Sequence, residues 1–123
     1  MPANYRIDPN KPWMEVKLTG QLTLEELADF SRRLRADAAY SDDLCGIIDC
    51  REMTNLWNLT ELRGFADDVN SRPGPAWRSK RALIVASPAQ YSIMRVFIVF
   101  ADSSPIQYNV FYSRETAMQW LKE

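Results

Sequence analysis

The sequence lacks histidine altogether, and it contains only two cysteines and four glycines among its 123 residues. Without histidine, neither a Ser-His-Asp nor a Cys-His catalytic group can be assembled, and imidazole ligands for a metal are excluded. Two thiols by themselves cannot complete a tetrahedral zinc site. Neither a Walker-type glycine loop nor a GxGxxG motif occurs. We therefore expect a protein that is not an enzyme and that has no catalytic residue, no metal site and no cofactor.

An excess of charge and long apolar runs are also absent. The 15 Lys and Arg residues nearly balance the 16 Asp and Glu residues, so no global field attracts the chain to nucleic acid or to an anionic bilayer. No apolar run reaches the roughly 18 residues that span a membrane, and the first residues carry no apolar leader segment. We therefore expect a cytoplasmic protein that neither binds nucleic acid nor inserts into a membrane.

The composition is typical of one folded domain. Hydrophobic residues make up 46% of the chain and charged residues 25%, which is ordinary for a globular protein. A chain of this length buries roughly two-thirds of its unfolded surface. Because no repeat, low-complexity tract or long linker divides the chain, residues 1–123 are expected to form a single domain.

The two cysteines, Cys45 and Cys50, fall in one predicted strand. An offset of five residues places their side chains on opposite faces and about 16 Å apart, so they cannot form a disulfide with each other. The spacing is not that of a CxxC redox motif. We interpret both as reduced, buried thiols.

Apolar patterning predicts five strands. In the second strand Met14, Val16 and Leu18 alternate with polar residues, which makes one face apolar. The third and fourth strands are continuously apolar, as expected of central strands that are covered on both faces. Proline and asparagine between the first two strands favour a hairpin, and the last strand is expected near an edge of the sheet. The predicted strands cover residues 5–9, 13–19, 45–48, 82–86 and 106–112.

Four segments follow a residue whose side chain can cap a helix N-terminus, and these segments are predicted helices. Three of the caps have a Glu or Gln three residues later, which is the spacing of a capping box. The first helix is expected over residues 24–39. The caps are Thr23, Asn58, Ser87 and Ser113, and the third-position partners are Glu26, Glu61 and Gln90.

This order predicts an α/β fold with a mixed five-stranded sheet, in which an N-terminal antiparallel hairpin is followed by parallel βα units and four helices pack on the sheet. The whole chain resembles the STAS superfamily, named for sulfate transporters and anti-anti-sigma factors, and in particular its small stand-alone bacterial members, which are called SpoIIAA-like. Three segments carry the resemblance, and each leads towards a helix: Gly20-Gln21-Leu22-Thr23, Ile47-Ile48-Asp49-Cys50 and residues 81–88.

The resemblance implies a regulatory module that is switched by phosphorylation. In anti-anti-sigma members a phosphorylatable serine stands just before the second helix, and here the matching segment is residues 57–60, in which Asn58 or Leu59 takes the place of the serine. Thr60 could accept a phosphate at this helix N-terminus, where free amides favour anions. Its plainer role is that of an ordinary residue in the first turn. Asn58 and Thr60 are therefore candidates for a switch or anion site.

Asp49 is the third candidate for such a site. It is predicted at the carboxyl end of a central strand, the edge where open α/β sheets place ligands. A catalytic interpretation would make it a base or a magnesium ligand. A structural interpretation would pair it with Arg51 or with backbone amides of its own loop. No second acidic residue stands at a comparable strand end, which weakens the metal interpretation.

The predicted third helix is apolar nearly all round, whereas an ordinary surface helix has one apolar stripe. Three interpretations remain open: burial between the sheet and its neighbours, an interface with a second copy or another protein, or the wall of a pocket for a hydrophobic ligand. The SpoIIAA-like group is similar in fold to lipid-carrying SEC14 domains, which is compatible with the third interpretation. The candidate interface or ligand-lining residues are Tyr91, Met94, Arg95, Ile98, Val99 and Phe100.

A basic, proline-rich segment follows the second helix. Its basic residues surround Trp77, as in a nucleic-acid contact with a stacking aromatic. The near-neutral net charge favours a solvated loop that is anchored by its tryptophan. Trp57, in the loop before the same helix, is interpreted either as a second exposed recognition residue or as a half-buried anchor. The basic residues are Arg72, Arg78, Lys80 and Arg81.

Taken together, the residues and the resemblance predict a non-enzymatic STAS-like module that acts through protein contact or as a homodimer. The alternative is a carrier or sensor of an apolar small molecule in a cleft beside the third helix. An enzyme that uses Asp49 is a third, weaker class.

Overall fold

The computed structural model describes residues 2–75 and 79–123, and it contains five strands and four helices in these ranges. The prediction for Trp77 and Arg78 lies outside the described residues. In chain order the elements are β1 (Ala3–Ile7), β2 (Trp13–Gly20), α1 (Leu24–Ala36), β3 (Cys45–Met53), α2 (Leu59–Asn70), β4 (Ser79–Ile84), α3 (Pro88–Phe100), β5 (Ile106–Phe111) and α4 (Arg114–Leu121).

The strands form one mixed sheet in the order β1-β2-β3-β4-β5. β1 pairs with β2 antiparallel, and every following pair is parallel. The predicted α/β class, the hairpin and the edge position of the last strand are therefore confirmed.

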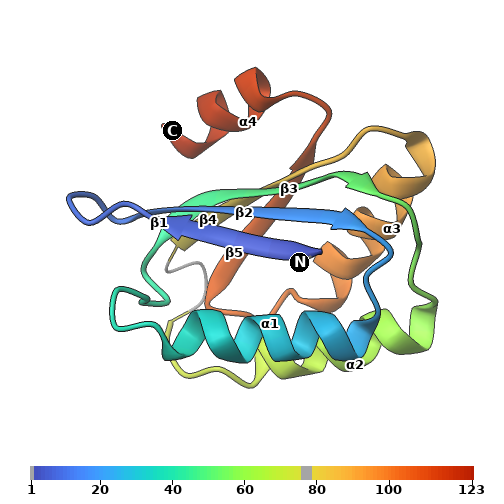
Figure 1. Cartoon of the computed structure of the whole chain (residues 1–123), viewed down its shortest axis with the longest axis horizontal. Coiled ribbons are helices and arrows are strands. Elements are labelled where there is room, and N and C mark those ends of the chain that lie inside the picture. Colours follow the sequence, from blue (N-terminus) through green and yellow to red (C-terminus); the bar gives the residue numbers. More distant parts are fainter. Residues whose placement is uncertain (1, 76–78) are drawn as a thin grey trace.

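The strand order determines where the helices lie. Each parallel crossover moves one strand further in the same direction, and right-handed crossovers in one direction place all their helices on one face of the sheet. Accordingly, α1, α2 and α3 cover one face, and α4 follows the last strand onto the other (Figure 1).

Two apolar layers result. The larger core lies between the sheet and the three crossover helices, and it includes the alternating side chains of Met14, Val16 and Leu18. The smaller core lies beneath α4, where Ile47, Ile84 and Ala117 are almost fully buried. Central strands covered on both faces explain the continuous apolar runs in β3 and β4.

All four predicted N-caps are confirmed, and two of them close complete capping boxes. Gln90 completes only half of its predicted partnership: its backbone amide donates to the Ser87 hydroxyl at 3.1 Å, but its side chain does not accept from the Ser87 amide. Its side-chain oxygen accepts from the Ala86 amide, one residue before the Ser87 cap, and its amide group donates to the carbonyls of Cys50 and Met53. Gln90 therefore ties the start of α3 to the end of β3.

Several predicted boundaries are wrong. α1 ends at Ala36 rather than at residue 39, because the Asp37 carboxylate accepts from the Ala39 amide and from the Tyr5 hydroxyl and thereby turns the chain. β3 continues to Met53, well past the predicted end of the strand. β4 begins at Ser79 and ends at Ile84, earlier than predicted. Among the described helices, none is long and apolar enough to cross a membrane.

Candidate ligand-binding cavity

A cavity lies inside the larger core, between the sheet and the crossover helices. Its floor is made by side chains that point from four neighbouring strands to the same face, because residues two apart in a strand share a face. The floor residues are Met14, Val16, Leu18, Ile48, Cys50, Arg81, Leu83 and Tyr108.

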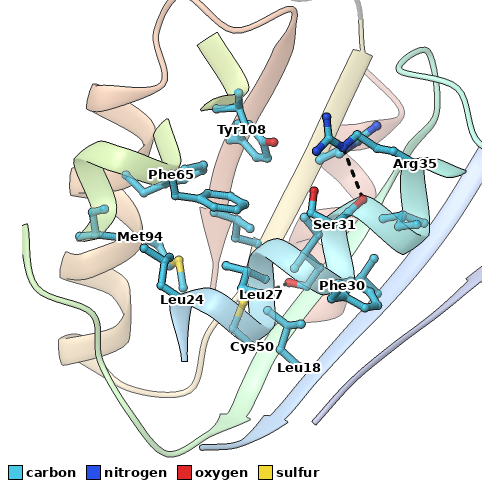
Figure 2. Close-up of a pocket in the computed structure, with 18 of the residues that line it drawn as sticks. Leu18, Leu24, Leu27, Phe30, Ser31, Arg35, Cys50, Phe65, Met94 and Tyr108 are labelled. Carbon is cyan, nitrogen blue, oxygen red and sulfur yellow. Dashed lines mark hydrogen bonds between the residues drawn. The ribbon is translucent and has the colours of Figure 1, made fainter. Parts of the chain in front are cut away.

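The roof comes from the inner stripes of the three helices. Figure 2 shows Phe65 of α2 and Met94 of α3 near Leu24 of α1, with Leu27 and Phe30 further along α1. Trp57, in the loop before α2, also lines the cavity, and its indole N–H donates to the Leu22 carbonyl at 3.1 Å. Trp57 is thus a buried anchor, and its interpretation as an exposed recognition residue is wrong.

The cavity has a volume of about 100 Å³. An apolar void of about 150 Å³ is large enough to bind benzene and to remain dry without it. In this conformation the cavity therefore accommodates a short apolar segment, and a larger ligand must displace part of the lining.

A second hollow of about 190 Å³ adjoins the cavity along the seam between α1 and α2. Ala28 and Gly64 line it, and small side chains at these positions leave the seam open. Leu24, Ser31 and Phe65 line both the seam and the cavity. The seam is therefore the natural route between solvent and the cavity.

The polar groups of the cavity gather at one end. Figure 2 shows Ser31 and Arg35, near the end of α1, on the side opposite Leu24 and Met94. Arg72, Arg81 and Tyr40 line the cavity as well. The lining is therefore apolar over most of its extent, and its arginines lie at the end near Ser31, opposite Leu24 and Met94.

Arg81 is a buried member of this group, with only 3% of its surface exposed. Its Nε donates to the Leu44 carbonyl at 3.3 Å, and its Nη2 donates to the Tyr40 hydroxyl at 3.1 Å. The Tyr40 hydroxyl in turn donates to the Asp42 carboxylate at 2.7 Å. Burial raises the pKa of Tyr40, so this phenol stays protonated and links the cation to the carboxylate.

Arg72 is also buried, with 8% of its side chain exposed. Its Nη2 donates to the Ser31 hydroxyl at 3.3 Å and lies 3.6 Å from the exposed Asp68 carboxylate. Its Nε is buried without a hydrogen-bond partner among the described residues. The solvated-loop interpretation is therefore wrong for Arg72 and Arg81, while Lys80 packs over the Trp120 ring of α4.

Cys50 is a cavity wall with no acid–base role at neutral pH. Its burial raises the pKa of the thiol to about 12, and the nearby Asp49 charge acts in the same direction. Because the thiolate is the nucleophile, this thiol is unreactive. Cys45 and Cys50 are both free, as the strand offset predicts, but only Cys50 is buried; Cys45 is half-buried, so the interpretation of both as buried thiols is wrong for Cys45.

Asp49 does not face the cavity. It lies inside β3 rather than at the strand end, so its predicted placement is wrong. Its carboxylate accepts from the Arg51 side chain at 2.9 and 3.0 Å and from the Arg51 amide at 3.1 Å. Burial opposes ionisation, but these hydrogen bonds outweigh it and lower the pKa of Asp49. Asp49 therefore pairs with Arg51, as the structural interpretation of this residue predicts.

The other candidate switch residues lie at the start of α2. Asn58 is the N-cap and accepts from the Glu61 amide at 2.8 Å. Thr60 is an exposed residue of the first turn. Neither lines the cavity.

The six candidates on α3 divide between inside and outside. Met94 is buried and lines the cavity, while Arg95 and Val99 are exposed on the outer side of the helix. Tyr91, Ile98 and Phe100 are half-buried against the core. Most of the apolar surface of α3 is therefore covered by its own protomer, mainly by α2 and β5.

Residue patterns did not identify the helical roof from α1 and α2 as ligand-lining, and they did not predict the burial of Arg72. For Arg81 a signal existed: it stands two residues before Leu83 and therefore on the same face of an apolar strand. A charged residue at such a position is buried with partners. No group of three or more potential metal ligands occurs among the described residues.

A solved structure matches this architecture over nearly its whole length. It is an uncharacterized protein of the DUF3478 family from Shewanella loihica PV-4, described as having a SpoIIAA-like fold. The TM-score is 0.61, and the match covers 97% of this chain and 91% of the other at 17% identity. This chain has a SpoIIAA-like fold. No family model and no curated protein matches the sequence. At this identity the likeness concerns the fold alone, and it agrees with the resemblance inferred from the residues.

Proposed function

We propose that this SpoIIAA-like domain binds an apolar small molecule in the cavity between the sheet and α1, α2 and α3, and that it performs no chemistry on its ligand. The cavity and its adjoining seam are the observation that supports this proposal. Binding pockets for small molecules are concave, largely apolar and equipped with a few polar groups at fixed places. The inert Cys50 thiol fits a binding role better than a catalytic one.

This proposal reverses the preference drawn from the sequence, which ranked protein contact above the binding of an apolar small molecule. Protein contact was expected because α3 carries more apolar surface than one sheet face covers. In the structure that surface packs largely within the protomer, and Met94 instead borders an internal cavity. The alternative function is therefore the one that the geometry supports best.

Calorimetry with the neutral probe 1-octanol tests the proposal, and we expect saturable binding to one site. Leu27→Trp places a larger side chain on the cavity roof and should weaken octanol binding at least tenfold. Leu59→Trp is the matched control because Leu59 is 60% exposed and does not line the cavity. No binding by the wild type, or equal weakening in both variants, would contradict the proposal.

Protein contact is the second candidate, and the outer side of α3 favours it. Val99 is 65% exposed there, one turn from the exposed Arg95. Light scattering coupled to size-exclusion chromatography tests it with the wild type and Val99→Glu. A dimer that becomes a monomer in the variant would support self-association through α3, whereas a wild-type monomer would remove that interface.

A further inference from the structure

A purely apolar ligand does not account for the arginines at the polar end of the cavity. Resting on the proposed function, we propose that the ligand is a single-chain amphiphile whose carboxylate head group binds Arg72, while its tail extends towards Leu24 and Met94. Arg72 lines the cavity, and only 8% of its side chain is exposed.

The hydrogen-bond partners of Arg72 are incomplete. A guanidinium presents five N–H donors in a planar fork. One nitrogen, Nη2, has the Ser31 hydroxyl at 3.3 Å, and it forms an ion pair with the Asp68 carboxylate, which at 3.6 Å is beyond hydrogen-bond distance. Nε has no partner among the residues that the structure describes. A buried cationic donor without an acceptor is costly, and a ligand oxygen at this place would remove that cost.

The surroundings of Arg72 reinforce the preference for an anion. Arg81 and Arg35 line the same cavity. Arg35 is exposed and directs its Nε to the carbonyl of Ser31 (Figure 2), the residue whose hydroxyl accepts from Arg72. Asp68 is the acidic residue of the adjoining seam, and its side chain is 53% exposed and therefore well screened. Positive charge thus dominates this end of the lining.

The shape of an arginine side chain selects the head group. The parallel N–H bonds of a guanidinium edge match the two oxygens of a carboxylate, and they also match two oxygens of a phosphate monoester. The cavity volume of about 100 Å³ favours the smaller and flatter carboxylate. A tail can run alongside α1, where Leu24 and Arg35 are separated by about 16 Å of helix.

Calorimetric titration with four probes of equal chain length tests this assignment: octanoate, 1-octanol, octyl phosphate and octylammonium. We expect the wild type to bind octanoate at least tenfold more tightly than octanol, which corresponds to about 1.4 kcal/mol, and to bind octylammonium most weakly. Equal affinity for octanoate and octanol would overturn the head-group assignment while leaving the proposed function standing. Failure of all four probes to bind would overturn both. Tighter binding of octyl phosphate would overturn the choice of a carboxylate.

Arg72→Gln should bind octanoate about tenfold more weakly and octanol as the wild type does. Arg33→Gln is the matched control, because Arg33 is an exposed α1 arginine that does not line the cavity, and it should change neither affinity. Equal loss of both affinities in Arg72→Gln would identify Arg72 as a packing residue and overturn the proposal.

A measurement on the wild type covers the case in which Arg72→Gln does not fold. Octanoate labelled with ¹³C at its carboxyl carbon reports its own ionisation by NMR. Contact with a guanidinium favours the charged form, so the pKa of bound octanoate should fall below that of the free acid. A raised pKa would place the carboxyl group in apolar surroundings and would overturn the proposal.

Discussion

At the scale of single residues, the informative feature is a charge held inside an apolar core. Arg81 is nearly fully buried, yet its donors have acceptors in the Leu44 carbonyl and the Tyr40 hydroxyl. The Tyr40 hydroxyl in turn donates to the Asp42 carboxylate. The Arg81 guanidinium also lies over the Tyr40 ring, 5.5 Å from the ring centroid. Buried charges persist where they are paired and hydrogen-bonded. One phenol thus connects a cavity wall to the loop before β3.

Removing that phenolic hydroxyl leaves a donor of Arg81 without an acceptor. We expect Tyr40→Phe to lower the free energy of unfolding by about 1–3 kcal/mol, because a buried donor then remains unpaired. Chemical denaturation measures the change. Tyr112→Phe is the control, since Tyr112 is 51% exposed, and it should stay within about 0.5 kcal/mol of the wild type. Equal effects would show that the Tyr40 hydroxyl does not stabilise Arg81.

The Cys50 thiol predicts a dependence of stability on alkaline pH. Its folded pKa of about 12 exceeds the ordinary value of 9.0 because the thiol is buried. The unfolded thiol therefore loses its proton at lower pH than the folded one, and the resulting stability is fully present below pH 9 and declines above it. Between pH 9 and 11 the wild type should lose up to about 1.4 kcal/mol per pH unit more than Cys50→Ala. Parallel pH profiles of the two proteins would contradict this.

At the scale of elements, the seam between α1 and α2 decides access to the cavity. Ala28 and Gly64 face this seam, and the half-buried Phe65 lines both the seam and the cavity. α2 carries a complete capping box and packs closely on α3, while its contact with α1 is slight. We infer that α1 and α2 separate more readily than α2 and α3.

Phe65→Ala should join the seam to the cavity. We expect faster association of 1-octanol and binding of longer alcohols, because the largest side chain between the two hollows is removed. Stopped-flow fluorescence of the cavity tryptophan, Trp57, would measure the rates. Some loss of stability, about 3 kcal/mol, accompanies truncation of a phenylalanine. Phe111→Ala, beneath α4, is the control that should not change the association rate.

At the scale of the whole molecule, the sheet order divides the protein into two unequal layers. Three helices share one face because successive crossovers run in one direction. The other face is covered by α4, which has eight residues. The thick layer contains the cavity, and the thin layer contains the small core of Ile47, Ile84 and Ala117. Both layers depend on the pairing of β2 with β3.

Gly46 permits that pairing, since a Cβ at this position would overlap the backbone carbonyl of Met14 on β2. We expect Gly46→Ala to destabilise the protein by several kcal/mol, because backbone atoms cannot yield as a side chain can. Gly64→Ala is the matched comparison: its Cβ meets open space in α2, and it should stabilise by about 0.5–1 kcal/mol. Thermal unfolding monitored by circular dichroism measures both. Similar effects of the two substitutions would contradict this account of β2–β3 pairing.

The sequence by itself determined the class of fold, the order of elements and all four helix caps, because alternation, helical periodicity and capping are interactions between residues a few positions apart. Boundaries such as the end of α1 required Tyr5, which is distant along the chain. The cavity and the burial of Arg72 were decided only by tertiary structure, whereas the place of Arg81 on the same strand face as Leu83 already indicated its burial. Whether three apolar helices fill a space or leave a hollow depends on how they pack against four strands, and local patterns contain no information about that fit.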